Sequence, residues 1–274
     1  MGRGDVVALI AGAGRLPIVL AEAVKARGHG LVCITIEGDG RALEPIADAA
    51  YRVGFGEINR IIAILRQHGA SRVLVAGQVQ RRRLVGEGDE TFRERLAARG
   101  DRREHGVFRD VVVQAFAEHG IAVASPLEFI GHLLIPTGAL TARVPTEAEW
   151  EDIRFGLQIG RATADLDIGQ TVVVKSGVIL AVEAAEGTDA AIRRAGAIAH
   201  GGVVVKVARS SQDERFDLPT IGPLTMTSLI EAKAAVLAAE AGRTLLLDRA
   251  ECLAAADQHG ISIIGVQIPL KVGG

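Results

Sequence analysis

Residues 6–17 read VVALIAGAGRLP, and this stretch decides the fold of the first half of the chain. Residues 6–10 form a short unbroken apolar run, which is typical of a strand buried on both faces of a sheet. Gly12 and Gly14 follow as a turn, and residues 16–26 then carry apolar side chains at helical spacing. A strand, a glycine turn and a helix in direct succession predict the first βα unit of a parallel sheet.

The same alternation of strand and helix continues to residue 124. It predicts strands at residues 31–36, 73–76 and 121–124, and helices at residues 58–67 and 108–119. Strands that alternate with helices of this length indicate a Rossmann-like, doubly wound parallel sheet. The pattern breaks at residues 80–105, which include Arg81-Arg82-Arg83 and a mixed-charge stretch. This segment indicates either a solvated helix face or loop, or a basic lip for phosphates or an anionic membrane.

A loop-like stretch at residues 135–138 indicates a domain boundary. We therefore expect an N-terminal Rossmann-like domain over residues 1–136 and a C-terminal domain over residues 137–274. The fold class is then α/β with two domains, the second being a mixed α/β domain.

Local signals define the elements expected in the second half. Thr146 and Glu149 have capping-box spacing and open a helix toward residue 159. Residues 171–183 are typical of a hairpin that turns at Ser176-Gly177. The other expected elements are helices at residues 188–199, 227–240 and 249–259, and strands at residues 203–207, 244–247 and 261–266. Asp248 is expected to cap the last of these helices.

Composition excludes several classes of protein. The formal net charge of −2 argues against a nucleic-acid-binding protein, which would be strongly basic. Cys33 and Cys252 are the only cysteines and lie in apolar runs, which favours buried, reduced thiols over a disulfide or a zinc site. The first strand signal leaves no room for a signal peptide, and no apolar run reaches the ~18 residues of a membrane span. We therefore expect a soluble, cytoplasmic protein.

The glycine turn after the first strand is a candidate phosphate-binding site. Gly12 and Gly14 let the backbone approach a ligand, and Arg15 and Leu16 open a helix whose N-terminus offers unpaired N–H groups. Gly77 follows a later strand and is expected at the same carboxyl edge of the sheet. A proline replaces the third glycine of the dinucleotide fingerprint, so the turn argues only weakly for NAD. A tight turn without a ligand is the alternative.

A second candidate site lies at residues 211–223, SQDERFDLPTIGP, where acidic, basic and amide side chains crowd together. Two prolines that flank a glycine exclude a helix interior and a central strand, so this stretch predicts a rigid loop. Such a loop can hold a polar ligand or a metal ion at a fixed position. The alternative is a solvated loop without a role.

Polar residues near two other elements complete the candidates. Lys206 lies within an apolar strand, where it either binds an anion such as phosphate or reaches solvent at the strand end. Thr188 either caps the following helix or contacts a ligand. Glu186 and Asp189 flank Thr188 and could hold a metal ion or orient water.

Five segments occur in an order that resembles one protein family: residues 10–17, 167–170 (DIGQ), 181–190 (AVEAAEGTDA), 217–222 (DLPTIG) and 240–244 (EAGRT). They resemble the LpxI-type UDP-2,3-diacylglucosamine pyrophosphatases of lipid A synthesis, and the resemblance covers essentially the whole chain. It implies an enzyme that hydrolyses UDP-2,3-diacylglucosamine to UMP and 2,3-diacylglucosamine 1-phosphate (lipid X). It also implies Mg²⁺ as cofactor, a catalytic C-terminal domain, transient contact with the inner-membrane surface, and a homodimer as one form of the enzyme.

The resemblance assigns roles to the candidate residues. Asp217 matches the important aspartate of the family, and the expected catalytic residues are Asp217, Lys206 and Asp189. The expected metal ligands are Asp217 and Glu186. The expected substrate-binding residues are Gly12, Gly14, Arg15, Leu16, Gly77, Thr188, Arg209, Gln212 and Thr220. The two acyl chains are expected to need an apolar trough between the domains.

The chain departs from the family pattern at three positions. Arg209 stands where relatives commonly have a second lysine, Arg102 replaces a second acid after Asp101, and Arg82 stands where relatives tend to have proline. Two alternatives stay open. Gly12 and Gly14 favour an NAD-linked oxidoreductase, and the altered Asp101-Arg102 segment favours a non-catalytic lipid- or nucleotide-binding protein of the same fold.

Overall fold

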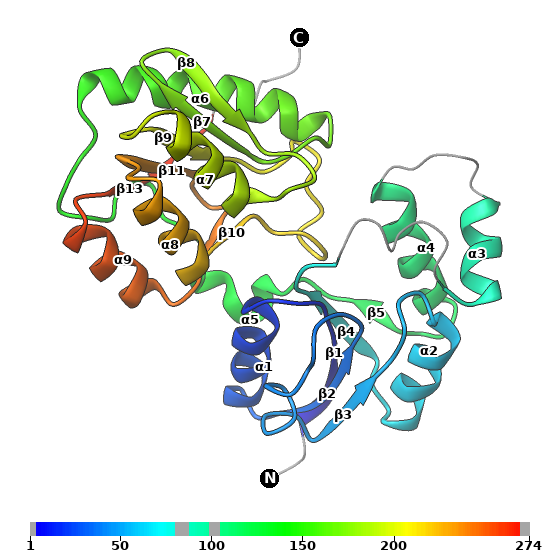
Figure 1. Ribbon diagram of the computed structural model, residues 1–274. Coiled ribbons are helices and arrows are strands. Elements are labelled where there is room, and N and C mark those ends of the chain that lie inside the picture. Colours follow the sequence, from blue (N-terminus) through cyan, green and yellow to red (C-terminus); the bar gives the residue numbers. More distant parts are fainter. Residues whose placement is uncertain (1–3, 80–87, 99–104, 269–274) are drawn as a thin grey trace. The chain divides into compact units, whose positions relative to one another are not determined.

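The computed structural model describes residues 4–79, 88–98 and 105–268 (Figure 1). The arginines at positions 81–83 and the Asp101-Arg102 pair lie outside these residues. The chain forms two compact units, of which unit 1 comprises residues 1–131 and 214–217, and unit 2 comprises residues 132–213 and 218–274. Both units combine helices with a β-sheet, which confirms the predicted α/β fold class.

Unit 1 is built around a parallel sheet with the strand order β3-β2-β1-β4-β5. The strand order reverses next to β1, as it does in doubly wound sheets, so the Rossmann-like prediction is confirmed. The elements are β1 (Gly4–Ala11), α1 (Leu16–Ala26), β2 (His29–Thr35), β3 (Ala49–Arg52), α2 (Ile58–Gln67), β4 (Arg72–Ala76), α3 (Glu90–Ala97), α4 (His105–Ala117), β5 (Ala122–Val123) and α5 (Leu127–Ile130). The short 3₁₀ helix η2 (Gly131–Leu133) follows α5.

Both faces of the central strand β1 are buried, as its unbroken apolar sequence predicts. Ala8 and Ile10 belong to a core that also contains the apolar side chains of α2 and α4. Helix α1 lies against β1, β2 and β4 on the other face of the sheet (Figure 1). Phe216, in the segment 214–217, packs against the core of α2 and α4.

Unit 2 contains a mixed sheet with the strand order β6-β13-β11-β9-β7-β8. Strands β9, β11 and β13 are parallel, while β6 and the β7–β8 hairpin run antiparallel to their neighbours. The elements are β6 (Gly138–Ala139), α6 (Glu147–Asp165), β7 (Thr171–Lys175), β8 (Val178–Val182), α7 (Thr188–Ile198), β9 (Val203–Lys206), β10 (Thr220–Ile221), α8 (Pro223–Glu231), β11 (Val236–Glu240), β12 (Leu245–Leu246), α9 (Arg249–Gln258) and β13 (Ser262–Val266). Strands β10 and β12 form a separate two-stranded sheet.

The two faces of this sheet are covered by different helices. Val203, Val205 and Val207 face a core shared with α6. Val204 faces the other core, which contains residues of α7, α8 and α9. Because side chains alternate along a strand, Lys206 must lie on the same face as Val204, under α7.

The predicted helix at residues 227–240 is wrong. Helix α8 ends at Glu231, and Val236–Glu240 is strand β11, buried along its whole length in the middle of the sheet. Lys233 has a φ of 48°, so the chain leaves the helix there in a left-handed conformation. The alanines of this stretch favour a helix on their own, but burial on both faces of a parallel sheet overrides that preference.

Three predictions about local signals have mixed outcomes. The capping box of Thr146 and Glu149 is confirmed, and so is the hairpin, whose turn residues Ser176 and Gly177 have φ of 50° and 75°. The predicted cap by Asp248 is wrong, because this residue is left-handed and its side chain makes no capping hydrogen bond. A carboxylate caps a helix from an extended backbone, which Asp248 does not have.

Candidate functional site

Lys206 forms the centre of a row of polar residues on the α7 face of the unit 2 sheet. Thr171 of β7 is its direct cross-strand partner, and Glu183 follows β8 with its N–H donating to the carbonyl of Thr171 at 2.9 Å. Lys206 is 5% exposed and Thr171 is fully buried. The sheet register therefore places a lysine, a threonine and a glutamate from three adjacent strands side by side.

The ammonium group of Lys206 is bound by threonine hydroxyls. Its Nζ donates to Thr188 Oγ1 at 2.8 Å and to Thr171 Oγ1 at 3.3 Å. Thr188 Oγ1 in turn donates to Glu183 Oε1 at 3.0 Å. Thr188 is the first residue of α7, and the N-cap position belongs to Gly187 instead. Thr188 therefore does not cap the helix, but links the buried cation to a carboxylate.

Glu183 is held in this row by the DIGQ segment. The backbone N–H of Gln170 donates to Glu183 Oε2 at 3.2 Å. A Cβ atom on Gly169 would lie 2.1 Å from the carbonyl oxygen of Glu183, so only glycine fits there. The sequence signals did not single out Thr171 and Glu183 as site residues. A strand register could have found them, since Thr171 pairs with Lys206.

The two acidic residues near Thr188 differ in their surroundings. Glu186 Oε1 accepts a hydrogen bond from Arg194 at 2.7 Å, and this bond holds the pKa of Glu186 below its usual value. Asp189 Oδ1 is buried and has no hydrogen-bond partner among the described residues. Because a buried carboxylate oxygen needs a partner, Asp189 is better suited than Glu186 to receive a ligand.

Arg209 and Gln212 lie in the loop that follows β9. The side-chain oxygen of Gln212 accepts hydrogen bonds from the backbone N–H of Arg209 and from Gln170 Nε2, both at 3.2 Å. Arg209 Nε lies 3.5 Å from Asp167 Oδ1. The structure thus brings Lys206, Thr188, Arg209 and Gln212 together in unit 2, as neighbours along one chain of contacts.

The glycine turn of unit 1 is closed by the loop that follows β4. Ala13 and Gln78 exchange two backbone hydrogen bonds of 2.8 Å. A Cβ on Gly12 would lie 2.5 Å from the carbonyl oxygen of Gln78, and one on Gly77 would lie 2.8 Å from that of Ala13. These two glycines are therefore required by loop packing. Gly14 and Arg15 are exposed, and Leu16 begins α1.

The polar loop at residues 211–223 is divided between the units. Asp217 is exposed and belongs to unit 1, whereas Thr220 lies in β10 of unit 2 and donates to the carbonyl of Leu218 at 2.8 Å. Neither unit by itself contains the expected ligand pair of Asp217 and Glu186. Within the described ranges, no group of three or more His, Cys, Asp and Glu side chains is arranged to hold a metal ion.

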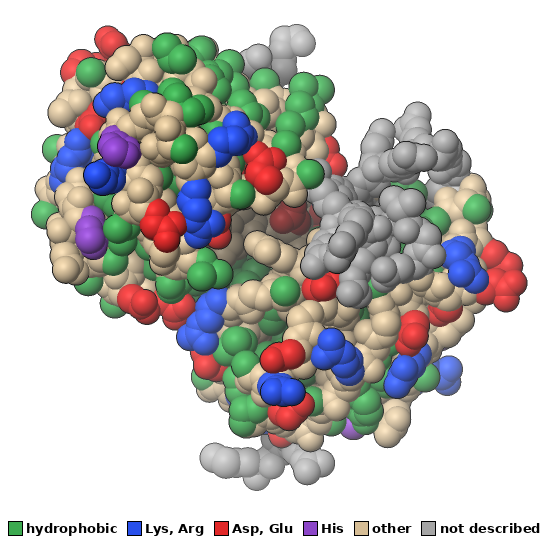
Figure 2. All heavy atoms as spheres, viewed as in Figure 1, with side chains coloured by type: hydrophobic (Ala, Val, Ile, Leu, Met, Phe, Trp, Pro, Cys, Tyr) green, Lys and Arg blue, Asp and Glu red, His purple; other side chains and the backbone are tan. Residues whose placement is uncertain are grey.

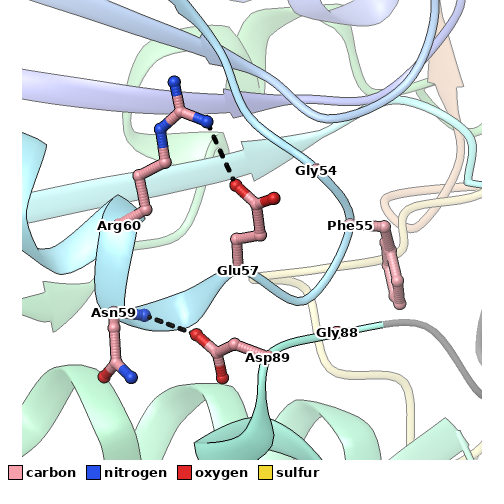
Figure 3. Close-up of a pocket in the computed structure, with 7 residues that line it drawn as sticks. All are labelled: Gly54, Phe55, Glu57, Asn59, Arg60, Gly88 and Asp89. Atoms are coloured by element: carbon pink, nitrogen blue, oxygen red, sulfur yellow. Dashed lines mark hydrogen bonds and ion pairs between the residues drawn. The ribbon is translucent and has the colours of Figure 1, made fainter.

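An open hollow of about 690 Å³ lies elsewhere, beside the start of α2 (Figure 3). It is lined by Gly54, Phe55, Glu57, Asn59, Arg60, Gly88 and Asp89. Asp89 accepts hydrogen bonds from the N–H groups of Asn59 at 3.1 Å and Phe92 at 2.8 Å, and Glu57 pairs with Arg60 at 3.3 Å. Asp89 thus binds the first turns of two helices, and Glu57 is neutralised by Arg60. Both carboxylates have a structural role, so we do not assign a ligand site to the hollow.

The described surface carries acidic and basic side chains together, as expected from a formal net charge of only −2. Figure 2 shows basic and acidic side chains interspersed with apolar ones on the visible face of each unit, without a large patch of one sign. Among the helices of the described residues, none is long and apolar enough to cross a membrane.

The chain is thus a two-unit α/β protein with a Rossmann-like first unit and a buried lysine in the second. Family models described as the LpxI N-terminal domain and the LpxI C-terminal domain match residues 6–133 and 136–264. A curated relative, the UDP-2,3-diacylglucosamine pyrophosphatase LpxI of Caulobacter vibrioides, is 33% identical over 274 residues, covering 94% of this chain and 96% of the relative. The chain belongs to the LpxI family, and the resemblance seen in its motifs is confirmed.

Solved structures show only weak likeness. The UDP-glucose-4-epimerase of Stenotrophomonas maltophila has a TM-score of 0.30 and 15% identity, over 43% of this chain and 34% of the epimerase. The N5-carboxyaminoimidazole ribonucleotide synthetase of Thermotoga maritima has a TM-score of 0.25 and 13% identity, over 62% of this chain and 38% of the synthetase. The chain spans less than half of either structure, and likeness at this level carries no functional argument.

Proposed function

We propose that this protein hydrolyses the pyrophosphate bond of UDP-2,3-diacylglucosamine in lipid A biosynthesis, releasing UMP and 2,3-diacylglucosamine 1-phosphate. The observation that carries the proposal is the similarity to the Caulobacter pyrophosphatase over nearly the full length of both chains. Family membership favours this hydrolase over an NAD-linked oxidoreductase. The loop packing at Gly12 and Gly77 also explains the glycines without a dinucleotide.

Lys206 is the residue that we propose to face a substrate phosphate. Its ammonium group is buried and its hydrogen bonds go to two neutral hydroxyls, so a phosphate oxygen would supply a direct negative partner. Thr188 begins α7, and the N–H groups at a helix start favour an anion. The ammonium group of Lys206 and the N-terminus of α7 lie together at Thr188, and both favour the binding of a phosphate.

We propose Mg²⁺ as the cofactor, with Asp189 of unit 2 as a carboxylate that would hold it, while Asp217 stays a proposed catalytic residue. The buried, unpartnered oxygen of Asp189 fits a hard cation, whereas the Arg194 contact makes Glu186 the weaker choice. When bound, Mg²⁺ would neutralise phosphate oxygens during hydrolysis. We further propose that the enzyme is cytoplasmic and reaches its lipid substrate at the inner-membrane surface.

The test is UMP release from UDP-2,3-diacylglucosamine by purified protein, with Mg²⁺, with EDTA, and with Mg²⁺ restored after EDTA. We expect activity only when Mg²⁺ is present. Full activity in EDTA would remove the metal from the proposal, and no UMP release under any condition would overturn the assigned reaction. Lys206→Met should lose at least about 10²-fold in kcat, because charge stabilisation at the phosphate is lost. Lys175→Met is the matched control, since Lys175 ends β7 at the opposite end from Thr171 and donates to the carbonyl of Gly201.

A further inference from the structure

We infer that Arg161, Glu240 and Arg243 are positioning residues, which hold the backbone of residues 208–210 so that Arg209 is already in place when the substrate binds. This inference rests on the proposed function of the site. It concerns residues on the α6 face of the unit 2 sheet, opposite to the row that contains Lys206.

The strand register places Glu240 at the centre of this group. Ala239 of β11 pairs with Lys206 of β9, and Glu240 therefore ends β11 next to the start of the loop after β9. Glu240 shares the α6 face with Ala238 and is 4% exposed. Its Oε2 accepts the backbone N–H of Ala208 at 2.8 Å.

Two guanidinium groups bind Glu240 and the loop at the same time. Arg161 Nη2 donates to Glu240 Oε1 at 2.7 Å, and its Nη1 donates to the carbonyl oxygen of Ala208. Arg243 Nη1 donates to Glu240 Oε1 at 3.4 Å, and its Nη2 donates to the carbonyl oxygen of Arg209 at 2.7 Å. Three backbone groups of the loop, the N–H and carbonyl of Ala208 and the carbonyl of Arg209, are thus fixed by one carboxylate and two forked cations.

The last turn of α6 fixes the rest of the loop. Asp165 accepts hydrogen bonds from the N–H of Ser210 at 2.7 Å and from its hydroxyl at 2.8 Å. Helix α6 can pack closely against β9, which leads into this loop, because two of its residues are glycines. A Cβ on Gly156 would lie 2.6 Å from Val205 Cγ2, and one on Gly160 would lie 3.3 Å from Val207 Cγ2.

A stabilising role alone does not account for this arrangement. Burying charges costs desolvation energy, and well-packed apolar residues often give equal or better stability than a buried ion group. What apolar residues cannot do is bind three backbone groups in a set direction. A guanidinium fork fits such contacts, whereas a lysine offers a single point of charge. The group is therefore suited to holding a loop that would otherwise have to be ordered during the reaction.

The test replaces each guanidinium by an ammonium, in Arg161→Lys and Arg243→Lys. Arg154→Lys is the matched control, because Arg154 lies on the same helix as Arg161 and pairs with the exposed Glu147. We expect kcat for UMP release to fall by about 10²-fold in both variants, because misplaced groups cost about that much. KM should change far less, and backbone amide hydrogen exchange at residues 208–210 should become faster. The control should match the wild type in all three.

Two results would overturn this inference. One is that the wild type is active and that Arg161→Lys and Arg243→Lys both have the same kcat as the wild type. The other is a loss of activity that only follows a loss of folded protein, with unchanged exchange at residues 208–210. A wild type that releases no UMP would instead overturn the proposed function, and the positioning role would fall with it.

Discussion

The ammonium nitrogen of Lys206 and the hydroxyl oxygen of Thr188 lie 2.8 Å apart, although one ends a strand and the other begins a helix. The same hydroxyl donates its proton to Glu183. Thr188 therefore couples a buried positive charge to a negative one without direct contact between the two. This geometry keeps Lys206 fixed while leaving its charge available to an anion.

Thr188→Val should lower kcat by about tenfold, because Lys206 loses its shortest hydrogen bond and the proton donated to Glu183 disappears. The free energy of unfolding should also fall by about 1–3 kcal/mol, since a polar contact is left unsatisfied. Steady-state kinetics and urea unfolding measure the two effects. Thr188→Ser keeps the hydroxyl and should stay close to the wild type. Equal kcat in the valine and serine variants would contradict the role of the hydroxyl.

Asp217→Ala should lower kcat by about 10²-fold while substrate binding is kept, as expected for a group that orients water or holds a metal ion. The free energy of unfolding should change by less than about 0.5 kcal/mol, because Asp217 is an exposed loop residue. Kinetics and thermal unfolding on one preparation separate the two effects. Glu214→Ala, an exposed change in the same loop, is the control. A stable variant with wild-type kcat would end the catalytic assignment.

Gly12→Ala should destabilise the protein by about 1–3 kcal/mol, because its Cβ would meet the Gln78 carbonyl and push the two loops apart. Chemical denaturation measures the change. Gly131→Ala is the matched control, since neither glycine has a positive φ and the nearest atom to a Gly131 Cβ lies at 4.0 Å. Similar stability of the two variants would show that the Ala13–Gln78 contact tolerates separation.

The buried thiol of Cys33 should make the protein less stable in alkali. Burial raises the pKa of Cys33 from 9.0 to about 12, so the folded state keeps its proton after the unfolded state has lost it. The associated stability is complete below pH 9 and is lost between pH 9 and pH 12, at up to about 1.4 kcal/mol per pH unit. Urea unfolding at pH 8 and pH 10 measures this, and Cys33→Ala should show a shallower decline. A parallel decline in both proteins would assign the effect to other groups.

Much of unit 1 could be predicted from the sequence, because β1, β2, β4 and β5 lie in short apolar runs and α1, α2 and α4 carry a helical period. Lys206 could also be recognised, as a charge within an apolar strand. The helix expected at residues 227–240 failed because alanine favours a helix locally while the sheet decides the outcome. Short strands such as Ala49–Arg52 and Thr220–Ile221 carry too few residues for a periodic signal.

Thr171 and Glu183, the strand residues of the Lys206 row, could not be predicted, for a different reason. Thr171, Glu183 and Lys206 meet through strand register, and no local pattern records which residues of distant strands lie opposite one another. The same holds for Glu240, whose role depends on the order of β9 and β11 in the sheet. Contacts between strands can be predicted only when the order and register of the strands in the sheet are known.

The shared cap formed by Asp89 makes two helices depend on one side chain. Its two oxygens bind the first turns of α2 and α3, which are separated by more than twenty residues of sequence. When the start of one helix frays, the other helix still holds the Asp89 side chain in position, so the broken hydrogen bond can form again. Each helix start therefore protects the other against local opening. Their amides should therefore exchange with solvent as one cooperative unit, and Asp89→Ala should split that unit into two.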